Sequence, residues 1–221
     1  MENIPKRFIR IWVGGSKAIP NQFNIWWKQF QDMHPEYEFI SITKLSQLNI
    51  PNNIKQIVYH VIENGTCAGL ADILRLVAIY DLGGIYIDTD VMPLKSFDPL
   101  TISDKPFLAK RSSKSFESAV IGSPKGHPAI LDTLNAMPEW YMKNVGRSAS
   151  IQSGPAFVSS VLFGRKDITH LPVKAFYPYN GFGAPKREQK IKMFSHKENF
   201  PNEMYAAHFS NHRWGGSPKG K

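Results

Sequence analysis

Residues 68–82 constrain the fold of this chain more than any other segment. They predict a helix with apolar side chains nearly all round it, at Leu70, Ile73, Leu74, Leu76, Val77 and Ile79. A helix that is apolar on every side has to be buried inside a domain. Gly83 and Gly84 follow it, where glycine suits a helix end, and a short strand is expected at 85–88. The segment therefore predicts an interior helix that leads directly into an interior strand.

Helices and strands are expected to alternate along most of the chain. We expect strands at 8–13, 37–42, 85–88, 106–110 and 118–122. We expect helices from 21 through 30 and at 53–63, 68–82, 127–143 and 154–163. This alternation is typical of an α/β sandwich with a mostly parallel central sheet. A length of 221 residues suits a single domain, which we expect at 1–214, with a frayed Gly/Lys-rich tail at 215–221.

Composition and the N-terminus favour a cytoplasmic protein. Glu2, Lys6 and Arg7 interrupt the first apolar residues, which is unlike a signal peptide. No run approaches the roughly 18–20 apolar residues of a membrane span. Cys67 is the single cysteine, so we expect neither a disulfide framework nor a cysteine-rich zinc site. A reducing cytoplasm fits this composition. We expect the protein there, free or at a membrane surface, or in the host cytoplasm if its source is a virus.

The net charge of +9 is concentrated in the second half of the chain. Residues 1–100 hold nine Lys and Arg against ten Asp and Glu, whereas residues 101–221 hold eighteen against eight. Four of these basic residues are close together, namely Lys186, Arg187, Lys190 and Lys192. The distribution favours an anionic partner such as nucleic acid, acidic glycan, lipid phosphate or a diphosphate. The alternative is a solvated, lysine-rich surface.

An Asp-x-Asp pair follows the strand that Gly83 and Gly84 introduce. Alternate side chains of a strand share a face, so we expect Tyr86, Asp88 and Asp90 to point together and the intervening isoleucines to point into the core. Two carboxylates so close repel each other, and a hard divalent cation removes that repulsion by accepting oxygen ligands. Such a cation can also bind a diphosphate and neutralise it as it leaves. The carboxyl end of a strand is also where open α/β sheets bind ligands.

Asp72 and Arg75 lie three residues apart on the predicted buried helix, so they share a face. One interpretation is a simple ion pair within the helix. The other is that they hold sugar hydroxyls or a phosphate beside the metal. Charges on an otherwise buried helix need partners, which favours the functional interpretation.

These residues together resemble the signature of the family 32 glycosyltransferases. The central match is Ala71-Asp72-Ile73-Leu74-Arg75, Tyr80 and Gly83-Gly84-Ile85-Tyr86-Ile87-Asp88-Thr89-Asp90. Other segments of the chain also resemble the family and occur in a similar order along the sequence. They are Ile4-Pro5-Lys6 through Ile11-Trp12-Val13-Gly14-Gly15, then Ile121-Gly122-Ser123-Pro124, His127-Pro128 and Gly154-Pro155. The family is related to yeast-type mannosyltransferases and, more distantly, to the glucosylating clostridial toxins. The resemblance implies a GT-A (Rossmann-like) fold, a UDP- or GDP-linked sugar donor, Mn²⁺ or Mg²⁺, and transfer with retention of configuration.

The resemblance also implies roles for individual residues. Asp88 and Asp90 match the metal-binding pair, and His208 is the implied third ligand because it opens a motif similar to the family's closing one, His208-Phe209-Ser210-Asn211-His212-Arg213-Trp214. The implied donor contacts are Trp12 (stacked on the base), Val13, Gly14, Asp72, Arg75, Tyr86, Thr89, Gly154, Pro155 and Trp214 (a cap on the donor). The implied catalytic residues are Asp72, Arg75, Asp90 and Gln152, with Asp72 and Gln152 beside the anomeric carbon. Trp12 could instead be a core residue. His212 stays open as a metal ligand, a phosphate contact or a surface residue, because small residues are common there in the family.

Two other functions compete with sugar transfer. A strand ending in Asp-x-Asp also opens haloacid-dehalogenase-type phosphatases, but these need a later acidic cluster, and the later aspartates are isolated at Asp98, Asp104, Asp132 and Asp167. A non-catalytic nucleic-acid-binding protein would explain the charge, but it would give the aspartate pair no role and no zinc-finger or aromatic RNA-binding motif is present. The acceptor is open. A glycan or glycolipid is favoured, and the alternatives are a modified (hydroxymethylated) base in phage-type DNA or a protein.

Overall fold

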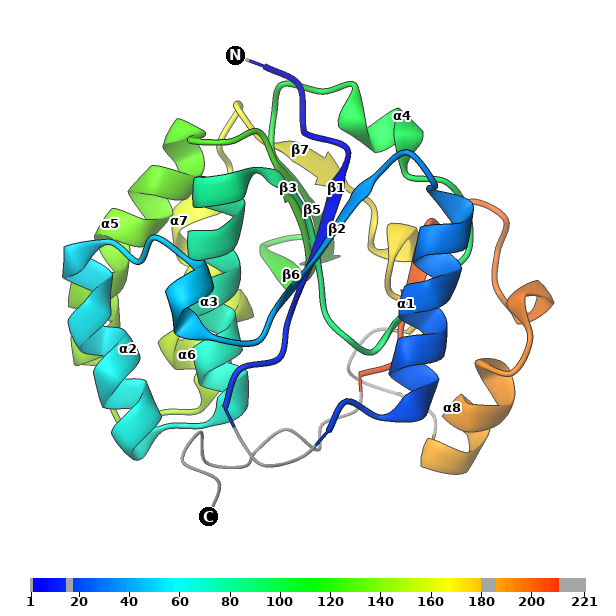
Figure 1. Ribbon diagram of the computed structural model, residues 1–221. Helices are drawn as coiled ribbons and strands as arrows, with labels where there is room; N and C mark the ends of the chain where they lie inside the picture. The colour runs from blue at the N-terminus through cyan, green and yellow to red at the C-terminus, as the bar shows by residue number, and fades with distance from the viewer. Residues whose placement is uncertain (1, 15–17, 180–185, 211–221) are drawn as a thin grey trace.

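A computed structural model describes residues 2–14, 18–179 and 186–210 of the chain. It forms a three-layer sandwich in which a twisted sheet, seen nearly edge-on, lies between two layers of helices (Figure 1). Five helices labelled α2, α3, α5, α6 and α7 cover one face of the sheet, and α1 and α8 lie over the other. Ligand-binding residues can therefore gather only at the edges of the middle layer or on loops.

The strands are β1 (Arg7–Ile11), β2 (Glu38–Ile42), β3 (Gly84–Ile87), β4 (Val91–Pro93), β5 (Phe107–Ser112), β6 (Ser115–Ser123), β7 (Thr169–Leu171) and β8 (Ala206–His208). The main sheet has the order β2-β1-β3-β6-β5-β7, and β4 pairs with β8 separately. Among the described strands of the main sheet, β6 alone runs against its neighbours, because its pairings with β3 and β5 are antiparallel and the others are parallel. The mostly parallel α/β sheet expected from the sequence is confirmed.

The helices are α1 (Asn21–Met33), α2 (Asn52–Asn64), α3 (Cys67–Leu82), α4 (Asp98–Thr101), α5 (Pro128–Lys143), α6 (Ala149–Gln152), α7 (Pro155–Leu162) and α8 (Arg187–Met193), with short 3₁₀ turns at Leu45–Gln47, Val173–Ala175 and Lys197–Asn199. The predicted helices and strands all occur, with ends that differ by a few residues. Within the described residues, no helix combines the length and the apolar character that crossing a bilayer requires.

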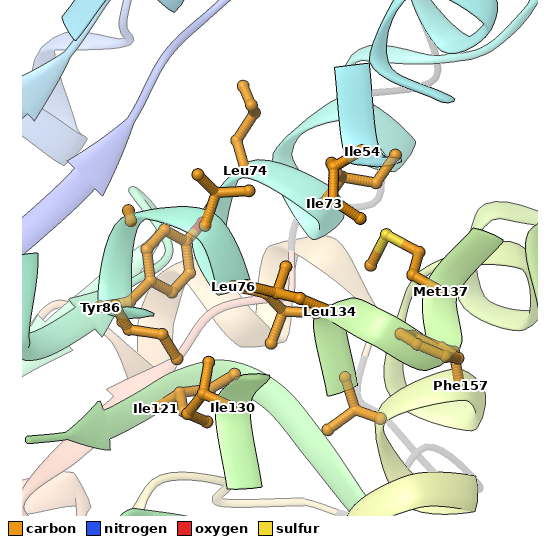
Figure 2. Close-up of a cluster of buried hydrophobic side chains, with 14 of the residues drawn as sticks. Ile54, Ile73, Leu74, Leu76, Tyr86, Ile121, Ile130, Leu134, Met137 and Phe157 are labelled. Carbon is orange, nitrogen blue, oxygen red and sulfur yellow. The ribbon is translucent and has the colours of Figure 1, made fainter. Parts of the chain in front are cut away.

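Helix α3 is buried as its sequence predicts. The Thr66 hydroxyl accepts a hydrogen bond from the Gly69 N–H at 3.0 Å and caps the start of the helix. Gly83 ends it with φ 68°, and a Cβ there would lie 2.7 Å from the Lys125 nitrogen, so only glycine fits. Between these ends the α3 side chains pack against β6, α5 and α7, where Figure 2 shows Leu76 beside Leu134. Each such buried side chain contributes about 1.5–3 kcal/mol.

Helix α1 covers the opposite face of the sheet with a single apolar stripe. Phe23, Trp26, Trp27 and Phe30 recur at helical spacing and are all buried. The Phe30 ring packs against Phe8 of β1, with ring centroids 4.9 Å apart. The sheet is therefore covered on both faces, and its interior strands have no solvated side.

Strand β3 is interior, as expected, but it ends before the aspartates that were expected to continue its alternation. It is buried along its whole length and ends at Ile87, so Asp88 and Asp90 lie in the turn that follows. The Asp88 N–H donates to the Ala119 carbonyl at 2.8 Å, and the Val91 N–H donates to the Asp88 carbonyl at 3.2 Å. The two aspartates therefore converge through a turn and not through the alternation of a strand.

Candidate active site

The two aspartates and His208 converge at the carboxyl ends of the parallel strands. The His208 Nε2 atom lies 3.2 Å from Asp90 Oδ1 and 3.8 Å from Asp88 Oδ2. Pairing of β4 with β8 places His208 opposite Val91, and the Phe209 N–H donates to the Asp90 carbonyl at 2.9 Å. Residues from distant parts of the chain are thus fixed to one another by backbone hydrogen bonds, and the two aspartates and the histidine expected as a group lie together.

Contacts with Ser210 and Tyr177 orient the imidazole of His208. Its Nδ1 atom is 3.1 Å from the Ser210 hydroxyl, so Nε2 is the nitrogen that faces the carboxylates. The Tyr177 ring packs edge-on against it, with centroids 5.8 Å apart. Burial alone would lower the pKa of His208, but Asp90 and then Asp88 outweigh it and hold the pKa above the ordinary value.

The three residues fit a divalent cation. One ligand atom from each of Asp88, Asp90 and His208 can be chosen so that all lie within 4.8 Å of one another. Separations of this size suit atoms that share one ion, because each would lie about 2.0–2.3 Å from it. Two carboxylates with one imidazole are a donor set of mixed hardness, which suits a transition-metal ion better than calcium or magnesium.

Arg75 ties the metal-binding turn to α3. Its Nη2 atom lies 2.9 Å from Asp72 Oδ1 and 3.1 Å from Asp88 Oδ1, while Nη1 donates to the carbonyl and hydroxyl oxygens of Ser118. Its guanidinium also lies over the Tyr86 ring, 4.7 Å from the centroid, and the Tyr86 hydroxyl donates to Asp88 Oδ1 at 2.5 Å. The guanidinium is therefore enclosed by partners, and its described contacts hold Asp72 and Asp88 in place.

The carboxyl group of Asp72 has an unusual electrostatic setting. Burial raises its pKa to about 7, although Arg75 opposes the shift. A Cβ on Gly154 would lie 2.8 Å from Asp72 Oδ2, so the backbone before α7 approaches the carboxylate as closely as glycine allows. Pro155 opens α7 directly after it, and Gln152 ends α6, two residues before Gly154. The backbone at Gly154 thus lies against Asp72, and the roles of Gln152 and Pro155 stay predictions.

The other predicted donor contacts lie at the same edge. Trp12, Val13 and Gly14 directly follow β1, which is adjacent to β3 and parallel to it, and the Trp12 N–H donates to the Ile42 carbonyl at 2.8 Å. Val13 packs partly against the core, whereas Gly14 is exposed with φ 82°. Thr89 is half-buried in the aspartate turn. Trp214 and His212 lie outside the described residues, so their roles stay predictions.

One part of the expected basic cluster has a different role. Lys190 is 7 % exposed, and its Nζ atom lies 3.3 Å from the carbonyl oxygens of both Phe209 and Ser210. It also lies 4.9 Å from the centroid of the Tyr179 ring. Burial lowers the pKa of its amine, although the charge of Asp90 opposes this. Lys190 therefore anchors the segment that carries His208 and is not available to an anionic acceptor.

Sequence reasoning missed Glu117, Ser118 and Tyr177. The Ser118 hydroxyl takes part in the Arg75 network, and the charge of Glu117 acts on both Asp72 and His208. Tyr177 packs on His208 as described above. None of these residues belongs to a motif. The strand predicted at 118–122 begins at Ser115 in the structure, and a longer predicted strand would have included Glu117.

Comparisons with known proteins point to one family. Residues 20–107 match the family described as "Glycosyltransferase sugar-binding region containing DXD motif". The chain is 28 % identical over 162 residues to inositol phosphoceramide mannosyltransferase 3 of Schizosaccharomyces pombe, covering 72 % of this chain and 44 % of that protein. It is 28 % identical over 148 residues to mannosyl phosphorylinositol ceramide synthase CSH1 of Saccharomyces cerevisiae, covering 65 % and 39 %. The chain thus spans less than half the length of these curated relatives.

Solved structures share the fold. PaToxG glycosyltransferase superposes with a TM-score of 0.64 at 22 % identity, covering 73 % of this chain and 70 % of that one. The ligand-free glycosyltransferase domain of the YGT toxin superposes with a TM-score of 0.61 at 10 % identity, covering 77 % and 80 %. In its matched region and its sequence relatives the chain is similar to DXD-containing glycosyltransferases, and it shares the GT-A fold of the solved glycosyltransferase domains.

Proposed function

We propose that this protein transfers a sugar from a nucleotide-diphosphate donor to a hydroxyl group of a glycolipid, with a divalent cation held by Asp88, Asp90 and His208. The observation that carries the proposal is the convergence of these three residues next to the Asp72–Arg75 pair. A cation site beside buried, ion-paired polar side chains suits a ligand with a diphosphate at one end and hydroxyl groups at the other.

The reaction breaks the bond between the anomeric carbon and the diphosphate oxygen and forms a bond from that carbon to the acceptor oxygen. The electron pair leaves with the diphosphate, and the acceptor proton is lost to the diphosphate or to water. A bound cation would supply neutralisation of the leaving diphosphate. Asp72 lies on the α3 side of the site and is suited to hydrogen-bond the sugar, while Arg75 holds Asp72 and Asp88 in position. Gln152, which ends α6 beside Gly154, is a second candidate near the anomeric carbon.

The donor and acceptor are inferred from the relatives. One curated relative is named as an inositol phosphoceramide mannosyltransferase and the other as a mannosyl phosphorylinositol ceramide synthase, which supports a mannosyl donor and a phosphate-bearing glycolipid acceptor. The YGT toxin domain has also been solved with UDP bound, which supports a nucleoside diphosphate as the leaving group. Mn²⁺ is our proposed metal because the site includes an imidazole. Retention of configuration and a cytoplasmic location are part of the proposal.

The test is donor cleavage by the purified chain. GDP-mannose, UDP-glucose, UDP-galactose and UDP-N-acetylglucosamine are incubated with Mn²⁺ or with EDTA, with and without inositol phosphoceramide in detergent. We expect cleavage of one donor that requires Mn²⁺ and is accelerated by the lipid, with a glycosylated lipid seen by mass spectrometry. Calorimetry with GDP and UDP serves as the second measurement. Failure of both nucleotides to bind with Mn²⁺, together with no cleavage, would contradict the proposal.

A further inference from the structure

Strand β6 extends past the end of β3 and borders the site. The β3 residue Ile87 pairs with Val120, and the Asp88 N–H donates to the Ala119 carbonyl, so residues 115–118 of β6 continue beyond the aspartate turn. Ser118 contacts Arg75 on the α3 face of the sheet. Adjacent side chains of a strand point to opposite faces. Glu117 is therefore directed to the face that carries Tyr177 and His208.

Glu117 is a partly enclosed carboxylate with one described cationic partner. Its Oε1 atom lies 3.2 Å from Arg111 Nε of the neighbouring strand, and its side chain is 25 % exposed. Burial raises its pKa, while the charges of Arg111 and His208 lower it and that of Asp88 raises it. Glu117 thus lies within electrostatic range of the metal-binding residues, yet it does not belong to the described group of atoms that could share an ion. This leaves carboxylate oxygen free to accept a hydrogen bond from a ligand.

Tyr177 provides an independent sign of a ligand. The residue is 5 % exposed, and its hydroxyl makes no hydrogen bond of normal geometry to the described residues, although the Val120 backbone is close enough to lower its pKa. Its ring is fixed against His208, and the carboxylates of Glu117 and Asp88 are close enough to raise the pKa of its hydroxyl together with burial. Buried hydroxyl groups without partners are rare and need an explanation, such as a functional role or a bound water, ion or ligand. Its ring lies against His208, one of the three residues that could share an ion, so the Tyr177 side chain borders the candidate metal site.

We propose that Glu117 and Tyr177 form a second sugar-binding pair, which holds hydroxyl groups of the transferred sugar on the side of Asp88 opposite Asp72. The inference rests on the proposed function. A carboxylate accepts hydrogen bonds from two adjacent hydroxyl groups, and a phenol both donates and accepts one. A diphosphate would be repelled by Glu117, so the chemistry of this pair suits the sugar and not the nucleotide. The Arg111 contact favours the charged form of the carboxylate, against the effect of burial.

The experiment compares nucleotide with nucleotide-sugar binding in Glu117→Gln and Tyr177→Phe. Calorimetry with Mn²⁺ uses GDP against GDP-mannose and UDP against UDP-glucose. We expect each variant to bind the nucleotide within about twofold of the native protein. We expect nucleotide-sugar affinity to fall about tenfold or more for Glu117→Gln and several-fold for Tyr177→Phe, as for lost hydrogen bonds to charged and neutral groups. Matched controls are Glu139→Gln and Tyr59→Phe, which change exposed side chains on α5 and α2.

Monodeoxy donors make the assignment specific. A donor that lacks the hydroxyl bound by Glu117 should bind the native protein and Glu117→Gln equally well, whereas the other deoxy donors should still distinguish them. Equal losses for nucleotide and nucleotide-sugar would overturn the inference, because they would indicate a structural or metal-binding role. Unchanged nucleotide-sugar affinity would overturn it as well. Lack of Mn²⁺-dependent nucleotide binding in the native protein is the different result that contradicts the proposed function itself.

Discussion

At the scale of single residues, Asp90 is the most direct test of the metal site. Its carboxylate is nearly buried and faces His208 Nε2 at 3.2 Å. We expect Asp90→Asn to lower kcat/KM by about 100-fold or more, because a neutral amide is a poor ligand for a hard cation. The fold should persist, because the Asp90 carbonyl still accepts the Phe209 N–H. Steady-state rates over a Mn²⁺ titration and a thermal melt measure both effects.

Asp32→Asn is the matched control, since Asp32 is exposed on α1 and pairs only with Lys28 among the described residues. It should leave the rate and the Mn²⁺ dependence unchanged. Full activity of Asp90→Asn with an unaltered Mn²⁺ response would rule out the proposed site.

Gly154 gives a second prediction at this scale. A methyl group there would lie 2.8 Å from Asp72 Oδ2, so Gly154→Ala must displace the carboxylate or the backbone before α7. We expect a loss of about 1–3 kcal/mol in the free energy of unfolding and a lower kcat. Gly69→Ala is the control, because its new Cβ would make ordinary contacts at 3.4 Å or more and alanine favours a helix. Equal stability and activity of the two variants would contradict the close approach.

The residues of the site differ in how far the sequence could predict them. Asp72 and Arg75 were predicted to share a helix face from their spacing, and their 2.9 Å contact confirms it. The Asp88–Asp90 pair was recognisable because it directly follows a glycine-introduced strand. Glu117 and Tyr177 were not, because their relation to His208 depends on strand pairing between segments far apart in the chain, which no local pattern encodes.

At the scale of elements, His34 joins the end of α1 to the loop before α4. Its Nδ1 is 2.9 Å from the Phe30 carbonyl, and its Nε2 accepts from the Phe97 N–H at 3.0 Å, which requires a neutral ring. Burial lowers its pKa below the ordinary 6.5, although the Phe30 carbonyl and Asp98 oppose this. A lowered folded-state pKa means that this stabilisation is complete above about pH 6.5 and is lost as the pH falls through the folded-state value.

We therefore expect the free energy of unfolding to decrease on acidification, with a contribution from His34 of at most about 1.4 kcal/mol per pH unit. His34→Gln keeps an acceptor for the Phe97 N–H but does not titrate. Urea unfolding of both proteins between pH 5 and pH 7.5 isolates the contribution as the difference in slope. Parallel stability curves would contradict a neutral His34 in the folded protein.

Helix α8 acts on the metal site through Lys190. The amine of Lys190 bonds to the Phe209 and Ser210 carbonyls, and Ser210 in turn contacts His208. We expect Lys190→Met to cost about 1–3 kcal/mol of stability, because two carbonyls lose their partner, and to weaken Mn²⁺ binding without removing a ligand. Lys192→Met, on the exposed side of the same helix, is the control. Calorimetric Mn²⁺ titration compares them, and equal affinities would contradict the anchoring role.

The elements themselves were predictable where a period extends over enough residues. The long apolar run of α3 and the stripe of α1 gave correct helices. β4, β7 and β8 were not predicted, because each is three residues long and too short to show alternation. β4 and β8 are nevertheless the elements that bring His208 to the aspartates. The site therefore depends on the part of the fold with the weakest local signal.

At the scale of the whole molecule, the direction of the strands explains where the chemistry occurs. β1, β3 and β5 run the same way, so the residues after β1, after β3 and at the β5–β6 turn meet at one edge of the sheet. The site is thus assembled from the first, central and last parts of the chain. The sequence predicted this edge from the direction of the strands. Basic residues of the second half of the chain also lie there.

Two exposed basic residues, Lys114 and Arg147, lie at this edge. Lys114 is in the β5–β6 turn, and Arg147 precedes α6, whose end bonds to the start of α3 through Ser153 and Gly69. Their charges should attract a phosphate-bearing acceptor.

Raising the salt from 50 to 200 mM should increase the KM of inositol phosphoceramide about threefold or more through screening, while the KM of a neutral glycolipid changes little. Lys114→Glu with Arg147→Glu should raise the same KM at low salt. Lys105→Glu with Lys166→Glu, before β5 and β7 at the opposite edge, should not. An acceptor KM indifferent to salt and to both double variants would show that this edge does not recruit an anionic acceptor.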